Sequence, residues 1–129
     1  MLAIDTNIIV RLLTRDDAAQ AARARALIED NDVFVGDTVM LETEWVLRAV
    51  YGFSPEAVVR ALRAFAGMAR VTLENPDIIA AALSHAEAGL DFADALHMTR
   101  AAHCAAFVTF DKGLVKAAQG AGVAGIKEG

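Results

Sequence analysis

The sequence alternates short apolar runs with longer stretches of helical periodicity, and this alternation constrains the fold more than any other feature. Strands that alternate with helices are typical of an α/β fold with a parallel sheet. The short runs are apolar throughout, as expected for strands that are covered on both faces of the sheet. We therefore expect a three-layer α/β/α fold with a central parallel sheet of four to five strands.

The bounds of the expected elements follow from the apolar pattern and from capping and turn residues. The expected strands are Met1–Ile4, Val33–Val35, Val71–Leu73, Ala106–Phe110 and Val123–Ile126. The expected helices are Asp17–Asp30, Asp37 to about Tyr51, Pro55 to about Met68, Asn75 to about Gly89, Asp91 to about His103, and Lys112–Gln119.

The length of 129 residues predicts a single domain over residues 1–129, because domains most often contain about 100–150 residues. The apolar fraction of 56% excludes a disordered chain. Cys104 has no partner cysteine, so a disulfide framework is excluded, and we expect a small buried side chain in a cytoplasmic protein. No apolar run is long enough to span a membrane, and no secretory signal is visible.

The net charge of −5 argues against nucleic-acid binding through a broadly basic surface. Eight of the twelve basic residues lie between Arg11 and Arg70, and all eight are arginines. Contact with nucleic acid through a local arginine patch therefore remains open.

Four acidic residues lie where expected strands end or expected helices begin. Asp5 and Asp111 each follow a strand, Glu42 lies one turn into a helix, and Asp94 lies in the first turn of the helix that Asp91 opens. In parallel sheets, ligands bind beyond the carboxyl ends of the strands. Clustered carboxylates repel each other, and Mg²⁺ or Mn²⁺ relieves this repulsion through oxygen ligands. Such a metal site positions a phosphate and activates a water molecule.

Each acid also has a purely structural interpretation. Asp37, Asp91 and Asp111 are suitable N-caps, and a carboxylate at the position of Asp94 favours the helix dipole. Glu44 is followed four residues later by an arginine, which predicts a surface ion pair. Glu42 shares its helix face with apolar residues, where a carboxylate needs a partner.

Four segments carry motifs in a characteristic order and spacing: Met1–Val10, Val39–Arg48, Asp91–Leu96 and Thr109–Asp111. Together they resemble the motifs of PIN-domain ribonucleases, in particular the VapC-type toxins of toxin–antitoxin pairs. The resemblance covers nearly the whole chain. It implies a PIN-like fold and an endoribonuclease that depends on Mg²⁺ or Mn²⁺ and leaves a 5′-phosphate and a 3′-hydroxyl.

The resemblance also implies a role for each acid. Asp5 and Asp94 would be the primary metal ligands. Glu42 would complete the acidic site or align the attacking water. Asp111 would be the fourth acid, a position where some members have asparagine, and Asp91 is an additional acid that many members carry.

Further residues and partners are implied by the same resemblance. Thr6 and Asn7 would steady the site through hydrogen bonds. The candidate RNA contacts are Arg48, Arg60 and Arg63, which could instead be solvated surface residues. A cognate VapB-type antitoxin would lay a helix on the toxin, and family members commonly form homodimers. Apolar residues of Ile8–Leu13 and Trp45–Tyr51 could serve an interface, with core packing as the alternative.

Two other function classes remain open. One is a catalytically silent PIN-like domain that binds RNA or protein. The other is an α/β phosphoryl-transfer domain, such as a receiver or a small phosphatase, although Thr6 and Asn7 follow Asp5 where these classes need further acids. No nucleotide cofactor is expected, because no GxxxxGK loop occurs and the GxGxxG match at 120–125 precedes no helix. The histidines and the lone cysteine lack the spacing of a zinc site.

Overall fold

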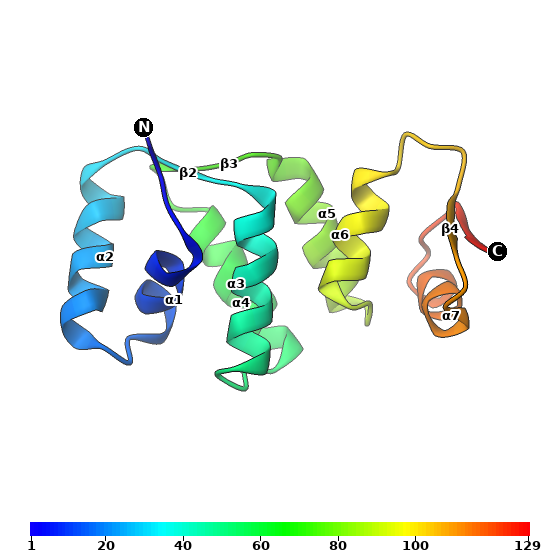
Figure 1. The fold of residues 1–129 in the computed structure, drawn as a ribbon, viewed down its shortest axis with the longest axis horizontal. Coiled ribbons are helices and arrows are strands. Elements are labelled where there is room, and N and C mark those ends of the chain that lie inside the picture. Colours follow the sequence, from blue (N-terminus) through cyan, green and yellow to red (C-terminus); the bar gives the residue numbers. More distant parts are fainter. The chain divides into compact units, whose positions relative to one another are not determined.

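The structure is a computed structural model that describes all residues, 1–129, and contains seven helices and five short strands. It divides into two compact units, Met1–Pro76 and Asp77–Gly129. Figure 1 shows the elements of the chain, coloured from the N-terminus to the C-terminus. Every strand pair is parallel. The expected α/β class with parallel strands is therefore confirmed, and each unit is described by itself below.

The first unit contains a three-stranded parallel sheet in the order β1-β2-β3. Its strands are β1 (Leu2–Ala3), β2 (Val33–Val35) and β3 (Val71–Leu73). The central strand β2 has both valine side chains fully buried. By contrast, both residues of β1 are exposed, so the expectation of a buried first strand is wrong. The reason is that β1 is a two-residue edge strand that pairs only with β2.

Four helices belong to the first unit: α1 (Thr6–Thr14), α2 (Ala18–Asp30), α3 (Asp37–Ala49) and α4 (Pro55–Ala66). The last three lie close to their expected positions. Ser54 caps α4 with Pro55 at its first position, as expected. No helix in the chain is long and apolar enough to cross a membrane.

Helix α1 was not among the expected elements. Its sequence is rich in β-branched residues, which have a weak helix propensity. Two signals nevertheless favour a helix. Asp5 provides an N-cap, and Thr6, Ile9 and Val10 are buried at the i, i+3, i+4 spacing of one helix face. The helix ends at Arg15, which adopts a left-handed conformation with φ 57°.

The second unit contains a two-stranded parallel sheet of β4 (Phe107–Thr109) and β5 (Ile126–Glu128). Its helices are α5 (Pro76–Glu87), α6 (Phe92–Arg100) and α7 (Lys112–Gly120). Helix α6 ends before the expected His103, and the turn that follows leaves Cys104 exposed rather than buried.

Two expectations about the strands need correction. The last strand lies at Ile126–Glu128 instead of Val123–Ile126, because Gly122 and Gly125 have φ of 73° and 80° and turn the chain there. The five strands form a three-stranded and a two-stranded sheet, not one sheet of four to five strands. The strands are only two or three residues long, and each finds its hydrogen-bonded neighbour within its own unit.

Candidate functional site

The junction between β1 and α1 positions the first candidate acid. The buried Ile4 ends the strand segment, and Asp5 follows in an extended conformation. The Oδ1 atom of Asp5 accepts a hydrogen bond from the backbone N–H of Thr6 at 2.7 Å. Asp5 thus caps α1, and its carboxylate lies at the positive end of the helix dipole. Because Asp5 itself is exposed, its carboxylate is accessible to a ligand.

Thr6 connects this junction to the second candidate acid. Thr6 is buried, and its hydroxyl group donates a hydrogen bond to Oε1 of Glu42 on α3. The bond joins residues 36 positions apart in the sequence. Glu42 is exposed rather than surrounded by apolar groups, and one of its carboxylate oxygens accepts a hydrogen bond from this threonine. The structure therefore brings Asp5, Thr6 and Glu42 together.

A cavity of about 300 Å³ opens beside these groups. Its polar lining consists of Asp5, Thr6, Asn7, Arg11, Glu42 and Tyr51. Val10, Val46 and Val50 form an apolar wall. We call this space the acidic cavity, because two carboxylates line it.

Three further candidate acids lie in the second unit, at the starts of two helices. Asp91 caps α6 and accepts a hydrogen bond from the N–H of Asp94 at 3.2 Å. Asp111 caps α7 and accepts one from the N–H of Leu114 at 3.0 Å. The capping interpretation of Asp91 and Asp111 is thus confirmed, and Asp94 lies in the first turn of α6 as expected.

The surroundings of Asp94 disfavour the charged form of its carboxylate. Partial burial raises the pKa of Asp94 above its ordinary value, and the negative charges of Asp91 and Asp111 raise it further. His97 acts in the opposite direction and lowers the pKa. A cation near Asp94 would compensate the burial and the repulsion that disfavour its charged form.

The donor set in both units suits a hard metal ion. It consists of carboxylate and hydroxyl oxygens without a thiolate, which matches Mg²⁺ and Mn²⁺ better than zinc. In neither unit do three His, Cys, Asp or Glu side chains gather closely enough to form a metal site. The first unit provides Asp5 and Glu42, and the second provides Asp91, Asp94 and Asp111.

Glu44 differs from Glu42 in both burial and partner. Its side chain accepts a hydrogen bond from Nε of Arg48 at 2.9 Å, so the expected ion pair is present. Glu44 is only 5% exposed, however, and the expectation of a surface pair is wrong. The reason is its position between the buried Thr43 and Leu47 on the covered face of α3.

The remaining candidate residues are distributed over α1, α3 and α4. Arg60 and Arg63 are exposed on α4, three residues apart. Asn7 is exposed and lines the acidic cavity. Within Ile8–Leu13, Ile9, Val10 and Leu12 are buried, so much of this run packs in the core. The second apolar run does offer surface, because Trp45 is 53% and Val50 is 63% exposed.

Sequence analysis missed a polar link between the ends of β2 and β3. Asp37 is buried and accepts a hydrogen bond from Nδ2 of Asn75 at 2.8 Å. The N–H of Asp37 donates to Oε1 of Glu74, also at 2.8 Å. Asp37 is therefore not the cap of α3; Gly36 holds that position, and Glu74 receives the hydrogen bond from the helix start. The sequence does contain a signal for this link, because polar residues that directly follow two adjacent parallel strands lie at the same edge of the sheet.

The structure is thus an α/β protein with carboxylates at a strand end and at the starts of helices. The family model of the PIN domain matches residues 2–120, and the chain belongs to this family. PIN domains are usually nucleases and typically bind Mg²⁺ or Mn²⁺. No curated protein matches the chain. The family match argues against the receiver and phosphatase alternatives.

The raised pKa of Asp94 can be measured by following its carboxyl carbon in an NMR titration of the metal-free chain. We expect a pKa above about 3.9, the value of an unperturbed aspartate. Asp111→Asn should lower this pKa, because it removes one neighbouring negative charge. Asp77→Asn is the matched control, since Asp77 is an exposed acid in the first turn of α5 and does not perturb Asp94.

The raised pKa of Asp94 also makes the free energy of unfolding depend on pH. The native state holds the Asp94 proton at pH values where the unfolded chain has released it. The free energy of unfolding contributed by this group therefore falls as the pH rises from the unfolded pKa through the raised folded pKa. An Asp94 pKa at or below the ordinary value, or equal responses to the two substitutions, would contradict the described electrostatics.

Proposed function

We propose that this PIN-domain protein is an endoribonuclease that depends on Mg²⁺ or Mn²⁺ and acts as the toxin of a toxin–antitoxin pair. The observation that carries the proposal is the arrangement at the β1–α1 junction. There, Asp5 is exposed beside a cavity, and the buried Thr6 holds the exposed Glu42 next to it. The family match and the resemblance of the four acidic motifs to VapC-type toxins support it further.

The resemblance to PIN-domain ribonucleases implies that four carboxylates of this chain take part in metal binding. Asp5 and Asp94 would be the ligands, while Glu42 and Asp111 would complete the acidic set, with Asp91 in a secondary role. A bound Mg²⁺ or Mn²⁺ would supply positive charge to the phosphate and lower the pKa of a bound water. Two observations fit this role: Asp5 is exposed and therefore accessible to a cation, and a cation beside Asp94 would offset the burial and the neighbouring negative charges that raise its pKa.

The residues around the acids would orient the reaction. Thr6 holds one oxygen of Glu42, which leaves the second oxygen to align the attacking water. Attack of this water on phosphorus breaks the bond between phosphorus and O3′. The proton released by the water is transferred to the leaving O3′ atom. The products are a 5′-phosphate and a 3′-hydroxyl.

The proposal also includes partners. A VapB-type antitoxin could pair an arginine with the exposed carboxylates and cover Trp45 and Val50 with a helix. A homodimer would offer a groove for RNA, and Arg60 and Arg63 on α4 are exposed for contact with it. Arg48 is a weaker candidate, because its guanidinium group already pairs with Glu44. The toxin would act in the cytoplasm, where its RNA substrates are.

Cleavage of total RNA by the full chain, freed of any antitoxin, tests the activity. We expect discrete fragments with Mg²⁺ or Mn²⁺ and none with EDTA. Asp94→Asn should reduce the rate by about 100-fold or more, because a neutral amide replaces a charged ligand. Asp77→Asn, which removes an equal charge from the same unit, should cleave like the wild type.

Two results would contradict the activity. Cleavage that survives Asp94→Asn would point to a contaminating nuclease or to a misplaced site. Absence of cleavage together with no increase in melting temperature on addition of Mg²⁺ or Mn²⁺ would favour the catalytically silent binding domain.

The contribution of Thr6 can be measured with a pair of variants. Thr6→Val removes the hydroxyl donor at nearly constant volume, whereas Thr6→Ser keeps it. We expect kcat to fall about tenfold in Thr6→Val, in the range of supporting hydrogen bonds at metal sites, and to change little in Thr6→Ser. Similar losses in both variants, or a change confined to KM, would show that the hydroxyl group does not orient Glu42.

A further inference from the structure

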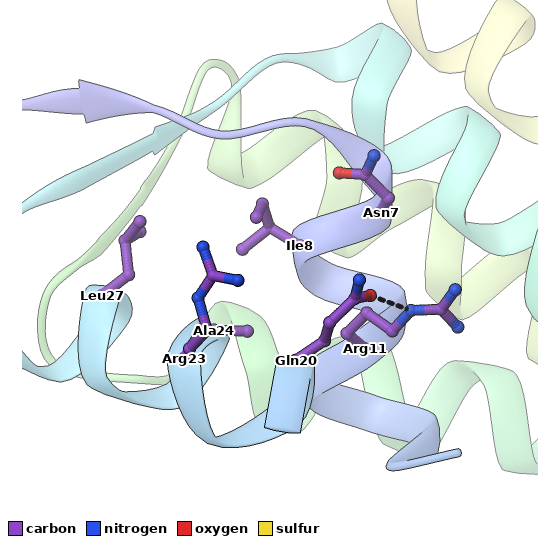
Figure 2. A pocket seen from close by; sticks show the side chains of 7 residues that line it. All are labelled: Asn7, Ile8, Arg11, Gln20, Arg23, Ala24 and Leu27. Carbon is purple, nitrogen blue, oxygen red and sulfur yellow. Dashed lines mark hydrogen bonds between the residues drawn. The ribbon is translucent and has the colours of Figure 1, made fainter. Parts of the chain in front are cut away.

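Helices α1 and α2 enclose a second cavity, of about 420 Å³, which we call the α1–α2 cavity. Its lining residues are Asn7, Ile8, Arg11, Gln20, Arg23, Ala24 and Leu27 (Figure 2). The lining includes two arginines and no carboxylate. It therefore has the opposite charge character to the acidic cavity, which Asp5 and Glu42 line.

Hydrogen bonds to Asp16 and Tyr51 fix the side chain of Arg11 at the wall of this cavity. Its Nη1 atom donates to both carboxylate oxygens of Asp16, at 2.8 and 3.0 Å, and also contacts the hydroxyl of Tyr51 at 3.1 Å. The hydrogen bond from Tyr51, together with those from Thr14 and Arg11, lowers the pKa of Asp16. Asp16 thus stays ionised, and its charge offsets that of Arg11.

The position of Arg11 also orients Gln20. The Nε atom of Arg11 donates to Oε1 of Gln20 at 2.7 Å, as the dashed line in Figure 2 shows. Because the carbonyl oxygen of Gln20 accepts this bond, its amide NH₂ group is left as a donor on the cavity side. Gln20 therefore offers hydrogen atoms, rather than an acceptor, to an occupant.

Arg23 supplies the positive charge of the cavity. It is exposed on α2, and its side chain extends toward α1, where Asn7 and Ile8 line the same space (Figure 2). Arg25, two residues further along the same helix, instead pairs with Glu29 at 3.1 Å and does not line the cavity. The cavity thus combines donors from Arg23, Gln20 and Asn7 with apolar groups of Ile8 and Leu27.

The two cavities are neighbours, because Asn7 and Arg11 line both of them. An extended polymer bound at Asp5 and Glu42 can therefore continue into the α1–α2 cavity. A nucleotide matches this lining, since its phosphate and base edges provide acceptors and its flat base provides an apolar face. The volume lies within the range of about 300–1,000 Å³ that small-molecule sites occupy.

We propose that the α1–α2 cavity is the subsite for the nucleotide next to the cleaved bond of a single-stranded RNA, with Arg23 binding its phosphate and Asn7 and Gln20 its acceptor groups. This inference rests on the proposed ribonuclease function. It assigns to Arg23 a contact with the substrate that is separate from the arginines of α3 and α4.

The test compares Arg23→Gln with Arg25→Gln in the full chain. Both substitutions remove one positive charge from an exposed position of α2. They differ in the place of the charge and in the ion pair with Glu29, which only Arg25→Gln removes. The probe is a short fluorescein-labelled single-stranded RNA, and its binding is followed by fluorescence anisotropy in EDTA over a series of salt concentrations. Circular dichroism confirms that both variants remain folded.

We expect Arg23→Gln to raise the dissociation constant about fivefold to tenfold at low salt. It should also reduce the slope of log K against log salt by about 0.7, as expected for the loss of one phosphate contact to a single strand. Arg25→Gln should change the dissociation constant by less than about twofold and leave the slope unaltered. In NMR spectra, RNA should shift the side-chain NH₂ signals of Asn7 and Gln20.

The outcomes separate this inference from the proposed function. If the wild type cleaves RNA with Mg²⁺ but the two variants bind RNA equally, the subsite is wrong and the ribonuclease function stands. If the wild type does not cleave but binding still depends on Arg23 and not on Arg25, the α1–α2 cavity binds RNA, while the catalytic proposal and the assignment of the cavity to the cleaved bond fail. A wild-type chain that binds no RNA in EDTA overturns the subsite.

Discussion

The junction between β1 and α1 is the constraint on which the candidate site depends. Three consecutive residues have distinct roles there: Ile4 is buried, Asp5 caps the helix, and Thr6 binds Glu42. An isolated helix of nine residues would be marginal in water, so α1 relies on its cap and on the burial of its apolar face. A shift of one residue at this junction would remove the cap, the hydrogen bond to Glu42 and the exposed carboxylate together.

The same acidic side chains stabilise helices and provide the proposed chemistry. Asp5, Asp91 and Asp111 are the N-caps of α1, α6 and α7, respectively. A helix N-terminus carries partial positive charge, which stabilises each carboxylate where it stands. Asp94 is not a cap, and burial together with the charges of Asp91 and Asp111 raises its pKa. The capping hydrogen bonds therefore fix the positions of three of the acids without any bound cation.

Features that depend on local sequence patterns, such as strands and helix caps, could be predicted from the sequence. The strands Val33–Val35 and Val71–Leu73 are confirmed, and so are the caps Ser54, Asp91 and Asp111. The resemblance of the four motifs to those of PIN domains is confirmed at the level of the family. What sequence analysis missed depends on contacts between distant residues, or on residues whose propensity opposes the fold. The β-branched residues of α1 obscured a helix, and neither the burial of Glu44 nor the lining of the α1–α2 cavity by Arg23 can be read from neighbouring positions.

The proposed metal centre is tested most directly by locating a bound metal ion in the full chain. In a titration of ¹⁵N-labelled protein with Mn²⁺, a bound ion broadens the amide signals of nearby residues. If the proposed centre forms, the signals around Asp5, Glu42 and Asp94 should broaden together, at the same Mn²⁺ concentration, and Asp94→Asn should weaken the broadening at Asp5 as well. Broadening around Asp94 alone, or equal broadening at an unrelated exposed acid such as Glu56, would contradict a metal centre formed by these residues.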